Sequence, residues 1–226
     1  MSLTAVERIR QSAPAILPSL LMCDFGDLRT EINRLEAAGT EVLHLDVMDG
    51  HFVPNLTYGM PIVAGLRKHT GMPLDVHLMI SDPLKYAKEF VDAGADLLTF
   101  HVEAVADPAA VAKQIASLGV GVGVAINPST SMERLGDCLD HCDLALVMSV
   151  EAGFGGQAFN PNAIERLREL RARYPNLLLE IDGGINGQTI SLARAAGCDL
   201  FVVGSAIFRH SDYGVAIKDL TTSMGA

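Results

Sequence analysis

The 226-residue sequence has few cysteines and fewer basic than acidic residues. The four cysteines, which suggest no disulfide pairing, are Cys23, Cys138, Cys142 and Cys198. We expect small buried thiols in a reducing cytoplasm, with Cys138 and Cys142 spaced four apart like neighbours on a helix. The 17 lysines and arginines face 27 acidic residues, which gives a net charge of −10. That charge argues against nucleic acid or an anionic membrane as a partner, although a local basic pocket could still bind phosphate.

Long apolar segments and linkers are also missing. No apolar run is long enough to cross a bilayer, and residues 1–10 lack the apolar stretch of a signal peptide. We therefore expect a cytoplasmic protein without a membrane partner. No low-complexity segment divides the chain, of which 49% is hydrophobic, so residues 1–226 are expected to form a single domain.

Short apolar runs recur along the chain and predict strands that begin roughly 20 to 35 residues apart, the length of one βα unit. The predicted strands are Ala15–Leu21, Val42–Met48, Leu74–Met79, Leu97–His101, Gly121–Ile126, Leu144–Val150, Leu177–Ile181 and Leu200–Val203.

Helical patterns lie between these strands. The segment 28–39 places apolar residues on one face and ends in Gly39, while Asp82-Pro83 and Asp107-Pro108 are typical helix starts. Seven strands are each expected to precede a helix, and the eighth precedes Tyr213–Thr222. Eight such units predict a compact α/β protein, a (β/α)8 TIM barrel, since this fold averages ~250 residues. The alternative is an open doubly wound sheet, but no Gly-x-Gly-x-x-Gly turn follows the first strand.

Histidine and aspartate interrupt three of the predicted strands near their carboxyl ends. His44 and Asp46 share one strand face because they are two residues apart, His77 lies in the next strand, and Asp182 follows a third. Imidazole and carboxylate groups in apolar strands predict a site for one metal ion, since burying them unpaired is costly. Asp46 and Asp182, on strands two and seven, could face each other across a ligand and exchange protons with opposite faces of one carbon. His101 is expected to be a core residue or to support the site from behind.

Glycine clusters follow the last three strands, where barrels often bind phosphate. The clusters are Gly153-Phe154-Gly155-Gly156, Gly183-Gly184 and Gly204-Ser205. Met48, Met79 and Met148 occupy inward positions near strand ends, where they would either fill the core or form an apolar lining that excludes water.

These motifs resemble the ribulose-phosphate 3-epimerase family from Ala15 to Phe208. The run His44-Leu45-Asp46-Val47-Met48-Asp49-Gly50-His51-Phe52-Val53-Pro54-Asn55 is similar to the signature of the family. The matching segments after it are Asp75–Met79, Thr99–Glu103, Gly153–Gln157, Asp182–Ile185 and Val203–Phe208. One departure is Ala152, where the family usually has proline; we expect it to loosen the loop without removing a functional side chain.

The resemblance implies interconversion of D-ribulose 5-phosphate and D-xylulose 5-phosphate, with Asp46 and Asp182 as the acid/base pair. It also implies one divalent metal ion per subunit, bound by His44, Asp46, His77 and Asp182. Zinc is the first expectation, and ferrous iron, manganese or cobalt would suit the same ligands. Ser19 and His77 would touch the substrate, whose phosphate would lie on Gly153 to Gly156, Gly183, Gly184, Gly204 and Ser205. Family members are commonly homo-oligomers, and we expect the same here.

Three alternatives remain open at this point. A sister enzyme could epimerise a six-carbon ketose phosphate such as allulose 6-phosphate with the same side chains, although the segment 55–61 resembles the pentose enzymes more. A lyase on a related barrel would resemble an Asp-x-Lys array, and no lysine lies near Asp46. A non-catalytic phosphosugar-binding barrel would not need the complete acid/base pair.

Overall fold

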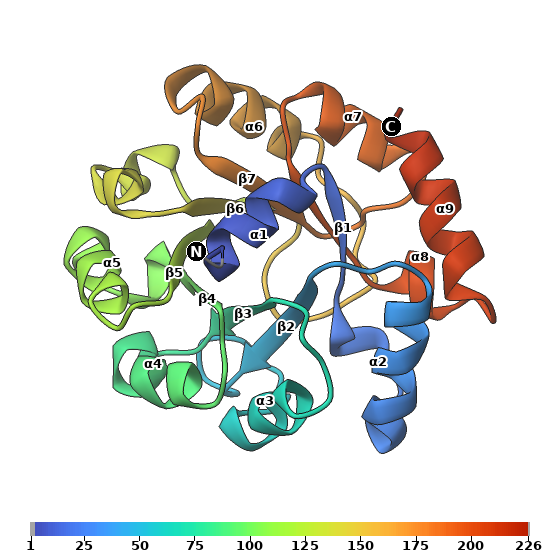
Figure 1. The fold of residues 1–226 in the computed structure, drawn as a ribbon. Helices are drawn as coiled ribbons and strands as arrows, with labels where there is room; N and C mark the ends of the chain where they lie inside the picture. The colour runs from blue at the N-terminus through green and yellow to red at the C-terminus, as the bar shows by residue number, and fades with distance from the viewer. Residues whose placement is uncertain (1–2, 226) are drawn as a thin grey trace.

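Eight parallel strands surround a central axis in the computed structural model, which describes residues 3–225 (Figure 1). The strands are β1 (Ala15–Pro18), β2 (Leu43–Met48), β3 (Leu74–Met79), β4 (Leu97–His101), β5 (Gly121–Ile126), β6 (Leu144–Met148), β7 (Leu178–Asp182) and β8 (Leu200–Val203). Their spatial order is β1-β8-β7-β6-β5-β4-β3-β2, and a parallel bridge between Ser19 and His44 joins β1 to β2. This nearly closed ring confirms the (β/α)8 barrel and excludes the open doubly wound sheet.

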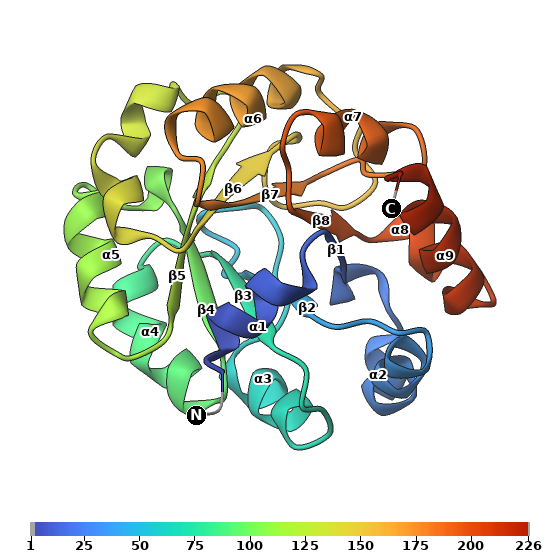
Figure 2. The same ribbon diagram turned by 45° about the horizontal axis from the view of Figure 1, so that its top comes forward.

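Helices surround the strands, and all but the first of them lie on the outer side of the ring (Figures 1 and 2). They are α1 (Ala5–Ser12), α2 (Leu28–Ala37), α3 (Met60–Arg67), α4 (Pro83–Asp92), α5 (Pro108–Ala116), α6 (Asn162–Arg173), α7 (Thr189–Ala195), α8 (Ser205–Phe208) and α9 (Tyr213–Ser223). Short 3-10 turns cover residues 20–22, 25–27, 102–104, 132–135 and 138–141. Asp82 and Asp107 cap α4 and α5 with proline at the start of each helix, as predicted. None of the helices in residues 3–225 has the length and apolar character that crossing a membrane requires.

Several predicted boundaries were wrong. β1 ends at Pro18 instead of Leu21, because the Ser19 hydroxyl accepts a hydrogen bond from the Leu21 N–H and starts a 3-10 turn. β6 ends at Met148, two residues early, and β7 extends through Asp182. β2 and β7 each begin one residue later than predicted.

The helix predicted between β5 and β6 was also wrong. Within the described residues, the 3-10 turns at 132–135 and 138–141 take its place. Gly136 separates these turns with a φ of +49°, a left-handed conformation that an α-helix does not contain. Cys138 and Cys142 lie in and just after the second turn, with their sulfurs 3.7 Å apart. All four cysteines are free thiols, but Cys23 and Cys142 are only half-buried.

Helix α1, which the strand pattern did not predict, covers the amino end of the barrel (Figure 2). Thr4 and Glu7 form its capping box. Ile9 is buried with the inward side chains of the barrel, and a Cβ on Gly121 would lie 2.5 Å from Val6. The Arg8 guanidinium donates to the Gly71 carbonyl over 3.0 Å. Because α1 fills this end, ligands can enter at the carboxyl ends of the strands.

The sequence Ala-Gly-x-Asp occurs twice, at residues 93–96 and 196–199, and each copy ties the amino ends of neighbouring strands together. The Asp96 carboxylate accepts hydrogen bonds from the Leu74 N–H, which opens β3, and from the Arg67 guanidinium, both over 2.8 Å. Asp199 makes the same two contacts, with Arg171 and with a backbone N–H of β7. The motif is therefore structural.

The interior of the barrel contains both apolar and polar side chains. Leu17, Leu144, Leu146, Leu200 and Val202 pack together inside, whereas β2, β3, β4 and β7 contribute polar groups. The polar inward side chains are His44, Asp46, Asp75, His77, Thr99, His101, Glu180 and Asp182. All of them except Asp182 are buried, and burial of a polar group is costly unless a partner satisfies it.

Candidate metal centre and active site

The barrel brings the four predicted metal ligands together. One ligand-type atom from each of His44, Asp46, His77 and Asp182 lies within 4.8 Å of the others. Asp46 and His77 are paired in the register of β2 and β3. Asp46 Oδ1 lies 3.4 Å from His44 Nε2 and 3.2 Å from His77 Nδ1, so these two nitrogens face the same oxygen. Asp182 reaches the group from β7.

The donor set fits a divalent cation. His44 Nδ1 is engaged with Asp75 Oδ2 at 2.6 Å, whereas His44 Nε2 is buried and has no hydrogen-bond partner among the described residues. A buried nitrogen without a partner is unfavourable unless a ligand satisfies it. Two imidazole nitrogens and two carboxylates match the ligands of zinc and of other divalent first-row metals.

The two aspartates have opposite electrostatic tendencies. Burial works to raise the pKa of Asp46, but the charge of the nearby His44, together with the close contact of His77, outweighs it and lowers the pKa. Burial, together with the negative charge of Asp46, raises the pKa of Asp182 from 3.8 to about 7. Near neutral pH, one carboxyl is thus ionised and the other is poised to hold a proton.

The two histidines also differ. The charges of Asp46 and Asp75 overcome the effect of burial and raise the pKa of His44 well above 6.5. Burial lowers the pKa of His77. A cation that bound His44 would release its extra proton, so its affinity would rise with pH.

A second buried carboxyl pair lies behind His44. Glu180 Oε1 is 3.0 Å from His44 Nδ1, beside Asp75, and neither oxygen of Glu180 has a hydrogen-bond partner among residues 3–225. Burial, with a further contribution from the charge of Asp75, raises the pKa of Glu180 from 4.5 to about 8. Near neutral pH the Glu180 carboxyl therefore remains largely protonated.

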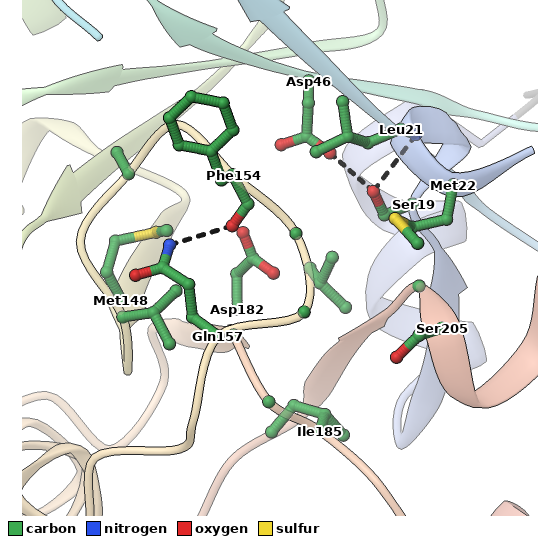
Figure 3. A pocket seen from close by; sticks show the side chains of 18 of the residues that line it. Ser19, Leu21, Met22, Asp46, Met148, Phe154, Gln157, Asp182, Ile185 and Ser205 are labelled. Atoms are coloured by element: carbon green, nitrogen blue, oxygen red, sulfur yellow. Dashed lines mark hydrogen bonds between the residues drawn. The ribbon is translucent and has the colours of Figure 1, made fainter. Parts of the chain in front are cut away.

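A cavity of about 250 Å³ opens above the four ligands at the carboxyl ends of the strands. This volume is just below the roughly 300–1,000 Å³ of typical ligand pockets and suits a small substrate. Figure 3 shows Asp46, Ser19 and Asp182 directed toward one space, with Phe154 and Gln157 on the neighbouring loop. The Ser19 hydroxyl donates to Asp46 Oδ2 over 2.6 Å. Met48, Met79 and Met148 also line the cavity.

All of the predicted phosphate-binding residues line this cavity: Gly153, Phe154, Gly155, Gly156, Gly183, Gly184, Gly204 and Ser205. A Cβ on Gly184 would lie 2.8 Å from the Phe159 nitrogen, and its φ is +62°. A Cβ on Gly204 would lie 2.9 Å from Met22. Glycine at these positions leaves room for the backbone to approach a ligand closely.

Comparison with known proteins identifies the family. A sequence model described as "Ribulose-phosphate 3 epimerase family" matches residues 15–208. The chain belongs to this family. It is 45% identical over 217 residues to "Ribulose-phosphate 3-epimerase" of Mycobacterium tuberculosis (strain ATCC 25618 / H37Rv), a match that covers 94% of each chain. It is 42% identical to "Ribulose-phosphate 3-epimerase, cytoplasmic isoform" of Oryza sativa subsp. japonica, over 94% of this chain and 95% of the relative.

The chain is thus an enzyme of the isomerase class. KGPDC from Streptococcus mutans, solved in complex with a phosphorylated sugar, has a TM-score of 0.71, and the match covers 94% of this chain and 97% of that one. Its sequence identity is 17%, so this likeness shows the shared fold alone. The six-carbon epimerase, the lyase and the non-catalytic barrel are not favoured, because the similar relatives are named ribulose-phosphate 3-epimerases.

Two of the predicted site histidines lie deeper than expected. His44 and His77 are fully buried, and neither is among the described residues that line the cavity. His77 therefore exposes no surface to the cavity through which it could make the predicted contact with substrate. His101 supports the site from behind, since its Nε2 is 2.8 Å from His77 Nε2.

Sequence reasoning assigned no role to Asp75, Glu180, Glu103 or Asn127, which contact the ligands or support the residues behind them. A signal for the first two was present. Asp75 is two residues from His77, and Glu180 is two residues from Asp182, so each shares an inward face with a predicted ligand. Asn127 gave no such signal, because it follows β5, whose inward residues are glycine and alanine.

Proposed function

We propose that the enzyme interconverts D-ribulose 5-phosphate and D-xylulose 5-phosphate at C3, with Asp46 and Asp182 as the two acid/base groups. The observation that carries this proposal is the pair of carboxyls that reach one cavity from β2 and β7 with their pKa values displaced in opposite directions. Such a displaced pair supplies one base and one acid at the same pH.

The proton at C3 lies next to the C2 carbonyl, so its removal leaves an enediolate. Asp46, which is ionised, takes the proton on one face of C3, and Asp182 returns a proton from the other face. In the reverse direction the two aspartates exchange roles. The hydrogen bond from Ser19 fixes the orientation of the Asp46 carboxylate, and the three methionines exclude water from the charged intermediate.

His44, Asp46, His77 and Asp182 would hold a divalent cation, with zinc proposed first and ferrous iron, manganese or cobalt as alternatives. When bound, this cation supplies electrostatic stabilisation of the negative charge that develops as the C3 proton leaves. The buried His44 Nε2 supports the assignment, because a cation would satisfy it.

The substrate phosphate is proposed to bind the backbone of the three glycine segments 153–156, 183–184 and 204–205, with Ser19, which lines the cavity, as a further substrate contact. Positive φ at Gly153, Gly156, Gly183 and Gly184 lets this backbone take conformations that other residues avoid. A barrel of the same fold, KGPDC, was solved with a phosphorylated sugar, which supports a phosphosugar as the ligand of this barrel.

The test compares wild type with Asp46→Asn and Asp182→Asn in heavy water. Loss of either acid/base group should lower the rate about 100- to 10,000-fold. The product of wild type should carry solvent deuterium at C3 from the first turnovers, since the returned proton is not the one removed. Direct transfer of the original hydrogen, or near-normal epimerisation by either metal-loaded variant, would contradict the two-carboxylate mechanism. A parallel assay on allulose 6-phosphate should give little turnover.

Three coarser expectations complete the proposal. We propose that residues 1–226 act as one domain, that the enzyme forms a homo-oligomer, and that it works in the cytoplasm. The word cytoplasmic in the name of the Oryza sativa relative supports the last point. Light scattering of the purified protein tests the second, because a monomeric mass would contradict it.

A further inference from the structure

A second histidine stacks behind the candidate ligand His77. His101, the last residue of β4, places its Nε2 2.8 Å from His77 Nε2, and the ring centroids are 4.9 Å apart. Both side chains are fully buried. Two ring nitrogens at this distance share one proton, so one donates and the other accepts.

A carboxylate lies at the far end of His101. Glu103 Oε2 is 3.1 Å from His101 Nδ1, and Glu103 Oε1 accepts a hydrogen bond from the Asn127 N–H over 2.8 Å. Burial opposes ionisation of Glu103, but these hydrogen bonds outweigh it and lower the pKa to about 2. The carboxylate is therefore an acceptor toward both neighbours.

The position of each ring proton follows from the His77 nitrogen that faces the ligand cluster. His77 Nδ1 lies 3.2 Å from Asp46 Oδ1, whereas Nε2 points toward His101. A cation bound at Nδ1 requires the His77 proton on Nε2, where it donates to His101 Nε2. His101 then carries its own proton on Nδ1 and donates it to Glu103.

The opposite tautomer of His101, with its proton on Nε2, would need a donor to Nδ1, and one candidate lies nearby. Asn127 Nδ2 is 3.4 Å from His101 Nδ1, and the Asn127 Oδ1 is engaged by the Ala152 N–H. If Asn127 donated to His101, the proton of His101 would move to Nε2 and that of His77 to Nδ1, where it would block a cation. The Glu103 carboxylate is closer to His101 Nδ1 than the Asn127 amide is, and it is charged, so it favours the proton of His101 on Nδ1.

We propose that Glu103 is a positioning residue that acts through His101 to keep the His77 proton on Nε2 and so leaves Nδ1 free for the cation. The inference rests on the cation site of the proposed function. It extends the usual pairing of a metal-bound histidine with one carboxylate by a second histidine. Loss of such outer contacts typically weakens metal binding about 10- to 100-fold.

The test uses Glu103→Gln in the full chain with zinc as the probe. Glutamine has the same size, but its one oxygen cannot accept from both His101 and the Asn127 N–H. We expect a roughly 10- to 100-fold loss of zinc affinity in competition with a chelator. Glu133→Gln, an exposed glutamate in the nearby 3-10 turn, is the matched control and should bind zinc like wild type.

Two-bond ¹⁵N–¹H spectra of zinc-loaded wild type give the second readout, which does not require the variant to fold. They should show His77 protonated at Nε2 and His101 protonated at Nδ1. A proton on His101 Nε2, or unchanged zinc affinity in Glu103→Gln, would overturn the positioning role while leaving the proposed function intact. Failure of wild type to bind zinc, cobalt, manganese or ferrous iron would instead overturn the cation site and the inference with it.

Discussion

Glu180 should make the metal-free protein less stable as the pH rises, and Glu180→Gln should remove this effect. The Glu180 side chain is fully buried, and its pKa is raised to about 8, first by burial and then by the charge of Asp75. Glutamine has the same shape and no ionisable proton. Between pH 4.5 and about 8, the folded chain holds a proton at Glu180 that the unfolded chain releases.

The sign and size follow from this difference in bound protons. Because the unfolded state binds fewer protons in this interval, the free energy of unfolding falls as pH rises. Each pH unit of displacement is worth about 1.4 kcal/mol, so the interval from 4.5 to about 8 sets an upper limit of roughly 5 kcal/mol. We expect Glu180→Gln to match wild type within about 1 kcal/mol near pH 5 and to be a few kcal/mol more stable at about pH 8.5.

Urea unfolding of chelator-treated protein at several pH values measures the effect. Ionisable groups remote from Glu180 are the same in both proteins, so their contributions cancel in the comparison. Glu165→Gln, at an exposed position of α6, is the control and should follow wild type at every pH. Parallel pH profiles for wild type and Glu180→Gln, or lower stability of the variant at the alkaline end, would refute the reasoning.

Three further outcomes are expected. Strong chelation should abolish epimerisation, and a divalent ion should restore it. His44→Ala should show the same loss of metal content and of rate. Full activity of metal-free protein would contradict the cation site. The loop Gly153–Gln157 should close over a phosphorylated ligand, because its glycines permit hinge motion and Phe154, which is 53% exposed, could cover the site. Hydrogen exchange of the loop should slow when the ligand binds, and equal exchange with and without ligand would exclude a lid. Tyr213→Phe should lower the free energy of unfolding by about 1–3 kcal/mol, because the Tyr213 hydroxyl donates over 2.7 Å to the buried Glu31. Urea unfolding measures this change, with Tyr86→Phe as the control. An equal effect of both substitutions would contradict the role of the hydroxyl.

Much of the site could be predicted because the strands are regular. Side chains alternate in a strand, so the spacing of His44 and Asp46 already placed them on one face, and the barrel fold placed Asp182 at the same end. The contact between His44 and Asp75 depends on register, since these residues are direct partners of β2 and β3. Register between strands 31 residues apart is not visible in local spacing.

The irregular parts were harder to predict. The end of β1 depends on one hydroxyl of Ser19, and the segment after β5 forms 3-10 turns in place of a helix. Ala152 was expected to loosen its loop, and this stays a prediction. In the structure its N–H donates to Asn127 over 3.0 Å, a hydrogen bond that proline could not make.

The contact between β1 and β2 links the stability of the barrel to the candidate site. In residues 3–225 these two neighbouring strands meet at the single bridge of Ser19 and His44, and Ser19 also holds Asp46 across the gap. The hydrogen bond between the Ser19 and Asp46 side chains therefore helps to hold β1 against β2. If this contact opened, β1 and β2 would become edge strands, which are exposed to pairing with other chains. Loss of the Ser19 hydroxyl would therefore weaken the barrel wall as well as the site, so selection on stability alone would favour keeping this residue.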